Sequence, residues 1–223
     1  MIFKLEFTWD KMNQKPLLLI IGNSNVGKSS ITRLLMPNPR KFKGKVGKSP
    51  GSTLLIKKTT QNNLPYEIVD LPGFGYVTHS SRRRGEHIKK QIVIHIEKYY
   101  KDYFLGLIII NITRIEDEIE KYYLKNMRTI PLSFELIQFL TEFKIPILIV
   151  INKIDKVSNQ DKKKILNLFI ESGKEYGLNL IQLNDYSYEQ KSKTPYLEFS
   201  ALKKINLTKL KSIIQKHLAN YIR

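Results

Sequence analysis

The sequence contains no cysteine, which excludes disulfide bonds and thiolate metal sites. Its four histidines are not spaced like metal ligands, so we expect no zinc site. Long apolar runs are also missing, because the stretches 17–21 and 105–110 are far shorter than the roughly 20 residues of a membrane-spanning helix. Glu6 and Asp10 interrupt the first ten residues, which do not resemble a secretory signal. We therefore expect a cytoplasmic protein without a membrane partner.

Acidic residues are scarce relative to basic ones. Lysine and arginine total 38 against 20 aspartates and glutamates, which gives a formal net charge of +18 and a pI near 9.8. Such an excess attracts polyanions and favours RNA, DNA or an anionic membrane as a partner. Charge alone does not separate these partners, and a lysine-rich composition also serves solubility.

Short apolar runs alternate with helical patterns along the 223 residues, as expected of an α/β fold with a mostly parallel sheet and helices on both faces. The segments 54–60 and 66–70 predict a hairpin, which adds one antiparallel edge strand. Further strands are predicted at 16–21, 105–112, 145–151 and 196–200.

Amphipathic helices are predicted between the strands. Ile88, Ile92 and Ile96 recur at near-helical spacing, and a second helix is expected behind Ser133 as its N-cap. A C-terminal helix is predicted from an apolar face made of Leu207, Leu210, Ile214, Leu218 and Tyr221. We expect one domain over 1–223, with an N-terminal extension at 1–15 and the core at 16–223, and loops or additions at 113–130 and 182–195.

Residues 22–29 (GNSNVGKS) match the phosphate-binding pattern GxxxxGK[ST], after a predicted strand and at the start of a predicted helix. Lys28 would reach the β- and γ-phosphates, the Ser29 hydroxyl would ligate Mg²⁺, and the helix dipole would favour the anion. By itself the pattern predicts only a phosphate site, which a kinase or an ATPase can also have. The candidate nucleotide-binding residues here are Gly22, Asn23, Ser24, Asn25, Val26, Gly27, Lys28, Ser29 and Ser30.

The sequence Asp70-Leu71-Pro72-Gly73 ends the third predicted strand. An aspartate there can hold Mg²⁺ through a water molecule, and the Gly73 N–H can contact the γ-phosphate. The same four residues alone would more often be an ordinary turn. Their position after the phosphate-binding loop favours a metal and nucleotide site.

The sequence Asn152-Lys153-Ile154-Asp155 follows the most apolar predicted strand. The Asp155 carboxylate can accept hydrogen bonds from N1–H and the 2-amino group of guanine, whereas adenine has neither donor; such a site discriminates by roughly 10⁴-fold or more. Asn152 would support the loops and Lys153 would lie along the base and ribose. We therefore predict a guanine nucleotide, with Phe199, Ser200 and Ala201 completing the base pocket.

A threonine between the phosphate-binding loop and Asp70 is needed to complete the Mg²⁺ shell and to contact the γ-phosphate. Thr53 suits this role, with Gly51 and Ser52 beside it. Thr59 and Thr60 are alternatives, but they fall within a predicted strand. The predicted metal ligands are thus Ser29, Thr53 and Asp70, and the predicted catalytic groups are Lys28, Thr53 and Gly73.

With these motifs, GNSNVGKSS, PGST, VDLPGFGY, NKID and FSALKK, the sequence from about Pro16 to the C-terminus resembles the EngB (YihA/YsxC-type) GTPases. PGST and DLPGFGY are its most specific marks. The resemblance implies a Ras-like P-loop GTPase domain, slow Mg²⁺-dependent hydrolysis of GTP to GDP, a role in assembly of the large ribosomal subunit, and a link to cell division and septation. Two positions differ from the family pattern: Asn152 replaces its usual threonine, and Ser52 its arginine-like residue.

Phe74 occupies the position where Ras-type enzymes have a water-orienting glutamine. A phenyl ring cannot orient water, so we expect unassisted turnover on the order of 10⁻⁴ to 10⁻² s⁻¹. Asn25 matches the asparagine with which related GTPases bind an activating K⁺. We therefore expect K⁺ as a candidate further cofactor; the alternative is that Asn25 only hydrogen-bonds the loop.

Basic residues gather in the two loops that flank the predicted γ-phosphate site, around 40–48 and 82–84. We expect nucleotide state to control presentation of this surface to ribosomal RNA rather than DNA, and we expect a monomer. Solvated loops without a partner are the simpler alternative. Two other functions stay open: a signalling switch that acts through protein partners, and an RNA-binding module that does not hydrolyse GTP.

Overall fold

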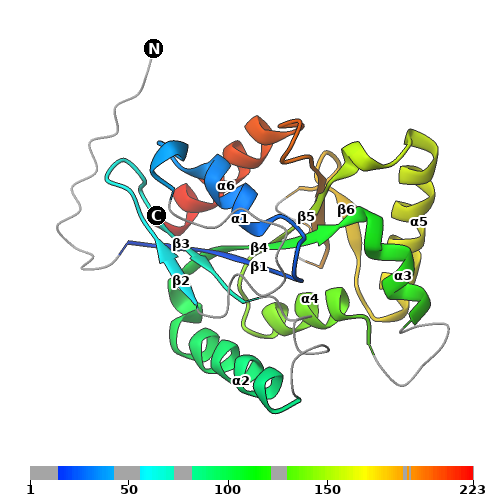
Figure 1. Cartoon of the computed structure of the whole chain (residues 1–223), viewed down its shortest axis with the longest axis horizontal. Helices are drawn as coiled ribbons and strands as arrows, with labels where there is room; N and C mark the ends of the chain where they lie inside the picture. The colour runs from blue at the N-terminus through cyan, green and yellow to red at the C-terminus, as the bar shows by residue number, and fades with distance from the viewer. Residues whose placement is uncertain are drawn as a thin grey trace.

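The computed structural model describes residues 15–42, 56–72, 82–121, 130–187, 190 and 192–222, with backbone alone at Lys41 and 82–85. In these parts of the chain, seven strands form one sheet in the order β2-β3-β1-β4-β5-β7-β6 (Figure 1). Neighbouring strands are parallel except β2 and β3, which pair antiparallel at one edge. The predicted mostly parallel sheet with one antiparallel edge strand is therefore confirmed. The strands are β1 (Leu17–Gly22), β2 (Lys57–Thr59), β3 (Glu67–Asp70), β4 (Tyr103–Asn111), β5 (Ile147–Asn152), β6 (Leu180–Gln182) and β7 (Thr194–Glu198).

The central strands are apolar on both sides because helices cover both faces of the sheet. Every residue of β1 and β4 is buried, as a continuous apolar run requires and an alternating pattern would not. One face is covered by α1 (Lys28–Leu35) and α6 (Leu207–Ile222). The other face is covered by α2 (Arg82–Tyr99), α3 (Ile115–Ile119), α4 (Leu132–Glu142) and α5 (Asn159–Glu175).

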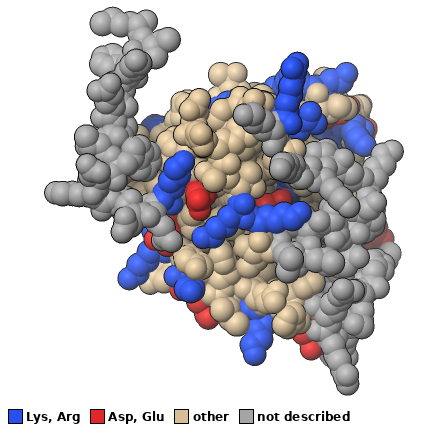
Figure 2. All heavy atoms as spheres, turned by 60° about the vertical axis from the view of Figure 1, so that its left-hand side comes forward, with Lys and Arg blue, Asp and Glu red and all other residues tan. Residues whose placement is uncertain are grey.

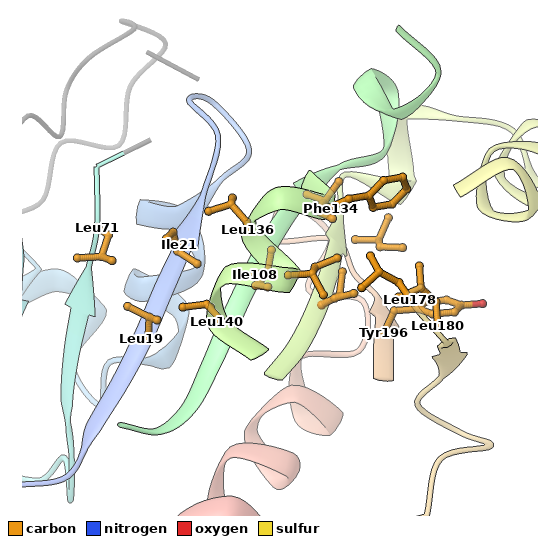
Figure 3. Close-up of a cluster of buried hydrophobic side chains, with 14 of the residues drawn as sticks. Leu19, Ile21, Leu71, Ile108, Phe134, Leu136, Leu140, Leu178, Leu180 and Tyr196 are labelled. Atoms are coloured by element: carbon orange, nitrogen blue, oxygen red, sulfur yellow. The ribbon is translucent and has the colours of Figure 1, made fainter. Parts of the chain in front are cut away.

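Figure 3 shows part of the core on the α4 side of the sheet. Leu19 and Ile21 of β1 and Ile108 of β4 point toward Leu136 and Leu140 of α4 (Figure 3). These side chains are at most 1% exposed, so the strands that carry the phosphate-binding loop and its neighbours are held by a dry core. None of the helices in the described ranges is long and apolar enough to cross a membrane.

The N-cap prediction for Ser133 is wrong. Helix α4 begins at Leu132 after Pro131, and no side chain of the N-cap residue bonds its first turn. Instead the Ser133 N–H donates to Oε1 of Glu118, at 2.6 Å, from α3. Burial raises the pKa of Glu118, and the bonds from Ser133 oppose that rise. A carboxylate from another helix thus satisfies a free N–H of α4.

Both segments expected to be loops contain regular structure. After β4 the chain forms a short 3-10 turn, Ile112–Arg114, and then α3, whose Ile115 and Ile119 are buried. Segment 182–195 includes the end of β6 and the first two residues of β7. A five-residue helix and a three-residue strand are too short for their periodicity to be recognised in the sequence.

Candidate functional site

The chain from Gly22 to Gly27 links the carboxyl end of β1 to the first residue of α1. Gly22 and Gly27 have φ of +149° and +105°, which L side chains rarely adopt. A Cβ on Gly22 would collide with the Ile109 carbonyl, and one on Gly27 with the Asn152 side chain. Both glycines are therefore required by the close approach of β4 and β5 to this loop.

Each carbonyl of the loop accepts a hydrogen bond. Because N–H and C=O point in opposite directions across a trans peptide, these bonds leave the N–H groups of residues 25–28 facing the other way, as a cradle for an anion. Three cationic side chains take part, which strengthens the polarisation of the peptides. The bonds are Lys28 Nζ to Gly22 O (3.0 Å) and Asn23 O (3.1 Å), Arg114 to Ser24 O (3.3 Å), Lys153 Nζ to Asn25 O (2.5 Å), Asn152 Nδ2 to Val26 O (2.8 Å) and Ile31 N to Gly27 O (3.0 Å).

Lys28 and Asp70 form the buried charged part of the site. Lys28 is 8% exposed and Asp70 5%. Burial lowers the pKa of Lys28, while Asp70 raises it. Burial raises the pKa of Asp70 to about 6, against the opposing effect of Lys28 and Lys57. Keeping either charge buried therefore destabilises the ligand-free protein. A bound metal ion and phosphate would compensate these charges.

The described residues fit a Mg²⁺ ion at the end of β3. Asp70 Oδ1 is buried and has no hydrogen-bond partner, which is unusual for a buried carboxylate oxygen. Asp70 lines the same cavity as Ser29, from the first turn of α1. Oxygen ligands of this kind suit Mg²⁺. Leu71 and Pro72 follow in buried positions, with the Leu71 N–H bonded to Ile20 O at 3.0 Å.

The second group of predicted residues lies beside the phosphate-binding loop, after β5 and β7. Asn152 connects the two loops, since its Nδ2 bonds Val26 O and its Oδ1 accepts from the Ala201 N–H at 3.0 Å. The Ser200 hydroxyl donates to Asp155 Oδ1, which orients that carboxylate. The Ile154 N–H donates to Phe199 O at 3.3 Å. Asp155 thus stands at a defined position next to the loop.

Lys153 adopts φ +68° and directs its ammonium group to the phosphate-binding loop. Burial lowers the pKa of Lys153 most, and the positive charges of Lys156 and Arg114 lower it further. The carboxylate of Asp155 has the opposite effect. Gly51, Ser52, Thr53 and Gly73 lie outside the described residues, so their roles stay predictions. Thr59 is in β2 and Thr60 directly follows it.

Arg114 is the residue at this site that sequence analysis missed. It comes from the 3-10 turn after β4, and β4 pairs directly with β1. The carboxyl ends of adjacent parallel strands meet at one edge of the sheet, so a polar residue after β4 had to lie near the phosphate-binding loop. That topological argument could have identified Arg114.

The fold and the phosphate-binding loop together place this protein in the class of P-loop GTPases. A family model described as "50S ribosome-binding GTPase" matches residues 18–153, and one for the GTP-binding domain of elongation factor Tu matches 129–220. The chain is 38% identical over 161 residues to a probable GTP-binding protein EngB of Methanococcus aeolicus, covering 72% of this chain and 67% of that protein. Its counterpart in Pyrococcus abyssi is 30% identical, over 84% of this chain and 93% of that protein.

Comparison with solved structures supports the same family and fold. A crystal structure of a probable GTP-binding protein engB superposes with a TM-score of 0.70 at 26% identity, over 92% of this chain and 99% of that one. Era, in complex with MgGDPNP and a segment of 16S ribosomal RNA, shares the fold, with a TM-score of 0.58 at 23% identity over 92% of this chain and 57% of Era. The chain belongs to the EngB family of GTP-binding proteins, and it is a GTP-hydrolysing enzyme.

Proposed function

We propose that this protein is a cytoplasmic, Mg²⁺-dependent GTPase of low intrinsic rate that binds the large ribosomal subunit during its assembly. A link to cell division would then be an indirect consequence of ribosome supply. The family description names 50S binding, and the net charge of +18 suits an RNA partner.

One observation carries the ribosomal part of the proposal: the metal site opens into a basic groove. The groove lies between the segment after α1 and the edge strand β2, and Asp70 is the one carboxylate among its described lining residues. Lys57 pairs with Asp70 in register and Arg40 lines the groove, whereas the Lys58 ammonium lies 4.8 Å from the Tyr99 ring centroid, on the α2 side of β2. Figure 2, which brings the β2 side of the molecule forward, shows basic side chains across the middle of this face. RNA phosphates bound here would lie close to the γ-phosphate of GTP.

The wall of this groove is fixed in place. The Asn38 N–H donates to Gln61 Oε1 at 2.9 Å, and Gln61 Nε2 donates back to Asn38 O at 3.0 Å. This pair joins the hairpin turn to the chain after α1. A preformed wall lowers the conformational cost of binding.

In the proposed mechanism the phosphate-binding loop orients GTP through its backbone N–H groups, and Lys28 leaves the Gly22 and Asn23 carbonyls for the phosphates. Ser29, Thr53 and Asp70 would hold Mg²⁺, which neutralises charge on the β- and γ-phosphate oxygens. Asp155 would select guanine. Thr53 and the Gly73 N–H would contact the γ-phosphate, so that hydrolysis releases both surrounding segments.

Binding to purified large subunits between 50 and 200 mM KCl tests this proposal. If six or more phosphates are contacted, affinity falls by roughly 10³-fold or more over that range. The variant Arg40→Glu should bind severalfold more weakly. Its matched control, Lys163→Glu, makes the same charge change on α5, beside the β6 edge of the sheet, and should bind normally. Salt-insensitive binding would indicate a protein partner instead.

A further inference from the structure

A second pocket lies where β4 and β5 begin, at the ends of the strands opposite to those that carry the phosphate-binding loop. Its volume is about 410 Å³, and its lining includes Tyr100, Lys101, Phe143, Lys144, His217 and Tyr221. The pocket also includes Tyr103 and Pro146, where β4 and β5 begin, whereas the phosphate-binding loop follows the carboxyl end of β1. It is therefore separate from the GTP site and from the basic groove, and its volume is sufficient for one nucleotide-sized ligand.

The apolar part of this pocket consists of aromatic rings. Tyr100, in the 3-10 turn after α2, is 37% exposed, and its ring centroid lies 5.9 Å from that of Phe143 at an interplanar angle of 52°. Phe143 is fixed in turn by Phe139, with centroids 5.2 Å apart. On the far side the Tyr221 hydroxyl donates to Lys101 O at 3.1 Å. The pocket thus presents exposed ring surface on a fixed frame.

Two lysines supply positive charge at the same place. Lys101 Nζ lies 5.7 Å from the Tyr100 ring centroid, and Lys144 is exposed. Neither forms an ion pair with any described residue. Burial lowers the pKa of His217 to about 4, with a smaller contribution from Lys216, so the imidazole adds no charge at neutral pH. Burial raises the pKa of Tyr221 most, and the nearby Asp102 carboxylate raises it further. The pocket therefore has the two lysines and one neighbouring carboxylate.

Lys144 occupies a backbone position that favours glycine. Its φ is +57°, directly after α4, where the chain turns and the Lys144 N–H donates to Thr141 O at 2.9 Å. A lysine there is less favourable for folding than a glycine. Its exposed side chain stands at the edge of the aromatic pocket, where its charge can reach the phosphate of a bound nucleotide.

We propose that this pocket binds single-stranded RNA, with a base stacked on Tyr100 and in edge contact with Phe143, and the adjoining phosphates bound by Lys101 and Lys144. The exposed Tyr100 ring, beside two lysines without an ion pair among the described residues, matches the π-face and the anionic backbone of a single-stranded nucleotide. Duplex RNA buries its bases and could not use the rings. The pocket lies where β4 and β5 begin, away from the nucleotide site at their carboxyl ends, so this binding should be the same with GDP and with a GTP analogue.

Fluorescence polarisation with a labelled ten-nucleotide oligouridylate tests the proposal. Tyr100→Ala should weaken binding by roughly tenfold, as expected for loss of one base–aromatic stack. Lys144→Gly should weaken it by a few fold and reduce the slope of log affinity against log salt by about 0.7, the value for one phosphate of a single strand. Its thermal stability should be equal or higher, so that lost binding cannot be ascribed to unfolding.

Lys204→Gly is the matched control. Lys204 is also exposed and has φ +55°, but it lies in the loop after β7, at the other end of the sheet. It should bind the oligouridylate like the unmodified protein. Equal binding by Tyr100→Ala, Lys144→Gly and the unmodified protein would overturn the proposal, as would equal affinity for a duplex of the same length.

This proposal and the ribosomal one fail separately. Subunit binding that is weakened in Arg40→Glu but kept in Tyr100→Ala, together with unchanged oligouridylate binding by Tyr100→Ala, would contradict only the pocket. Oligouridylate binding that depends on Tyr100, without any binding to large subunits, would support the pocket and contradict only the ribosomal proposal.

Discussion

Asn152 at the end of β5 and Val26 in the phosphate-binding loop are 126 positions apart in the sequence and are joined by a 2.8 Å hydrogen bond from Asn152 Nδ2 to Val26 O. The same side chain accepts a bond from Ala201, so one buried amide ties the phosphate-binding loop to the proposed base pocket. Loss of this amide should therefore affect folding and nucleotide binding together.

We expect Asn152→Ala to lower the free energy of unfolding by about 2 kcal/mol, because two buried backbone groups lose their partner. GDP affinity should fall by about tenfold or more, since both loops are released. Chemical denaturation and titration with a fluorescent GDP analogue measure the two effects. Asn152→Asp keeps the acceptor for Ala201 but sets a buried carboxylate oxygen against the Val26 carbonyl, so it should be at least as destabilising as Asn152→Ala. Unchanged GDP binding by Asn152→Ala would show that the two loops are independent.

Mg²⁺ binding should weaken as the pH falls through about 6. Burial raises the pKa of Asp70 to about 6 from an ordinary 3.8, so its carboxylate is protonated in a range where an exposed aspartate is not. A protonated Asp70 would then hold the Mg²⁺-bound water less well and would add no negative charge near the ion. We expect the stimulation of GDP binding by Mg²⁺ to be full at pH 7.5 and largely lost at pH 5. Equal Mg²⁺ affinity at both values would contradict the assignment of Asp70.

The raised pKa of Asp70 also affects the stability of the ligand-free protein, but there low pH is favourable rather than unfavourable. The folded state binds the Asp70 proton more tightly than the unfolded state, so the contribution of this group to stability falls as the pH rises from 3.8 to about 6. Asp70→Asn lacks this contribution, whereas other buried acids such as Glu118 titrate in both proteins. The difference in unfolding free energy between the two proteins should thus shift in favour of the unmodified protein toward low pH.

Arg114 should contribute to nucleotide binding through the Ser24 carbonyl. Its bond is 3.3 Å long and exposed, so we expect Arg114→Ala to reduce GDP affinity only about three- to tenfold. Arg114→Lys should restore part of the loss, because the charge remains. Lys156→Ala removes a positive charge from the next loop and serves as a control. Equal loss in both variants would mean that only the general charge matters.

Potassium should accelerate hydrolysis if Asn25 binds it beside the phosphates. Turnover in equal concentrations of KCl and NaCl measures the effect, and Asn25→Ala should remove any difference. Identical rates in the two salts would mean that Asn25 serves only the loop, where φ of +62° and the bond from Lys153 already give it a structural role.

The phosphate-binding loop and every strand of the described sheet except the three-residue β6 could be predicted, because their signals are local. An apolar run such as β1, followed by a glycine pattern and a helix, is encoded within about twenty neighbouring residues. The predicted boundaries of β4, β5 and β7 differ from the structure by one or two residues, since strand ends depend on the neighbouring strand.

The N-cap of α4 and the role of Arg114 could not be read in the same way, because both depend on contacts between elements. Ser133 looks like a cap in sequence, yet the carboxylate that bonds its N–H comes from Glu118 in another helix. Arg114 lies in a segment whose helical structure was not expected, and its bond to Ser24 spans 90 positions. Such pairs are visible only once the order of the strands is known.

Co-sedimentation with purified large ribosomal subunits, at fixed salt and with either GDP or a non-hydrolysable GTP analogue, tests the central claim most directly. We predict tight binding with the analogue and weaker binding with GDP, because the basic groove adjoins the γ-phosphate site. No binding in either state would contradict the ribosomal role and leave a GTPase with another partner.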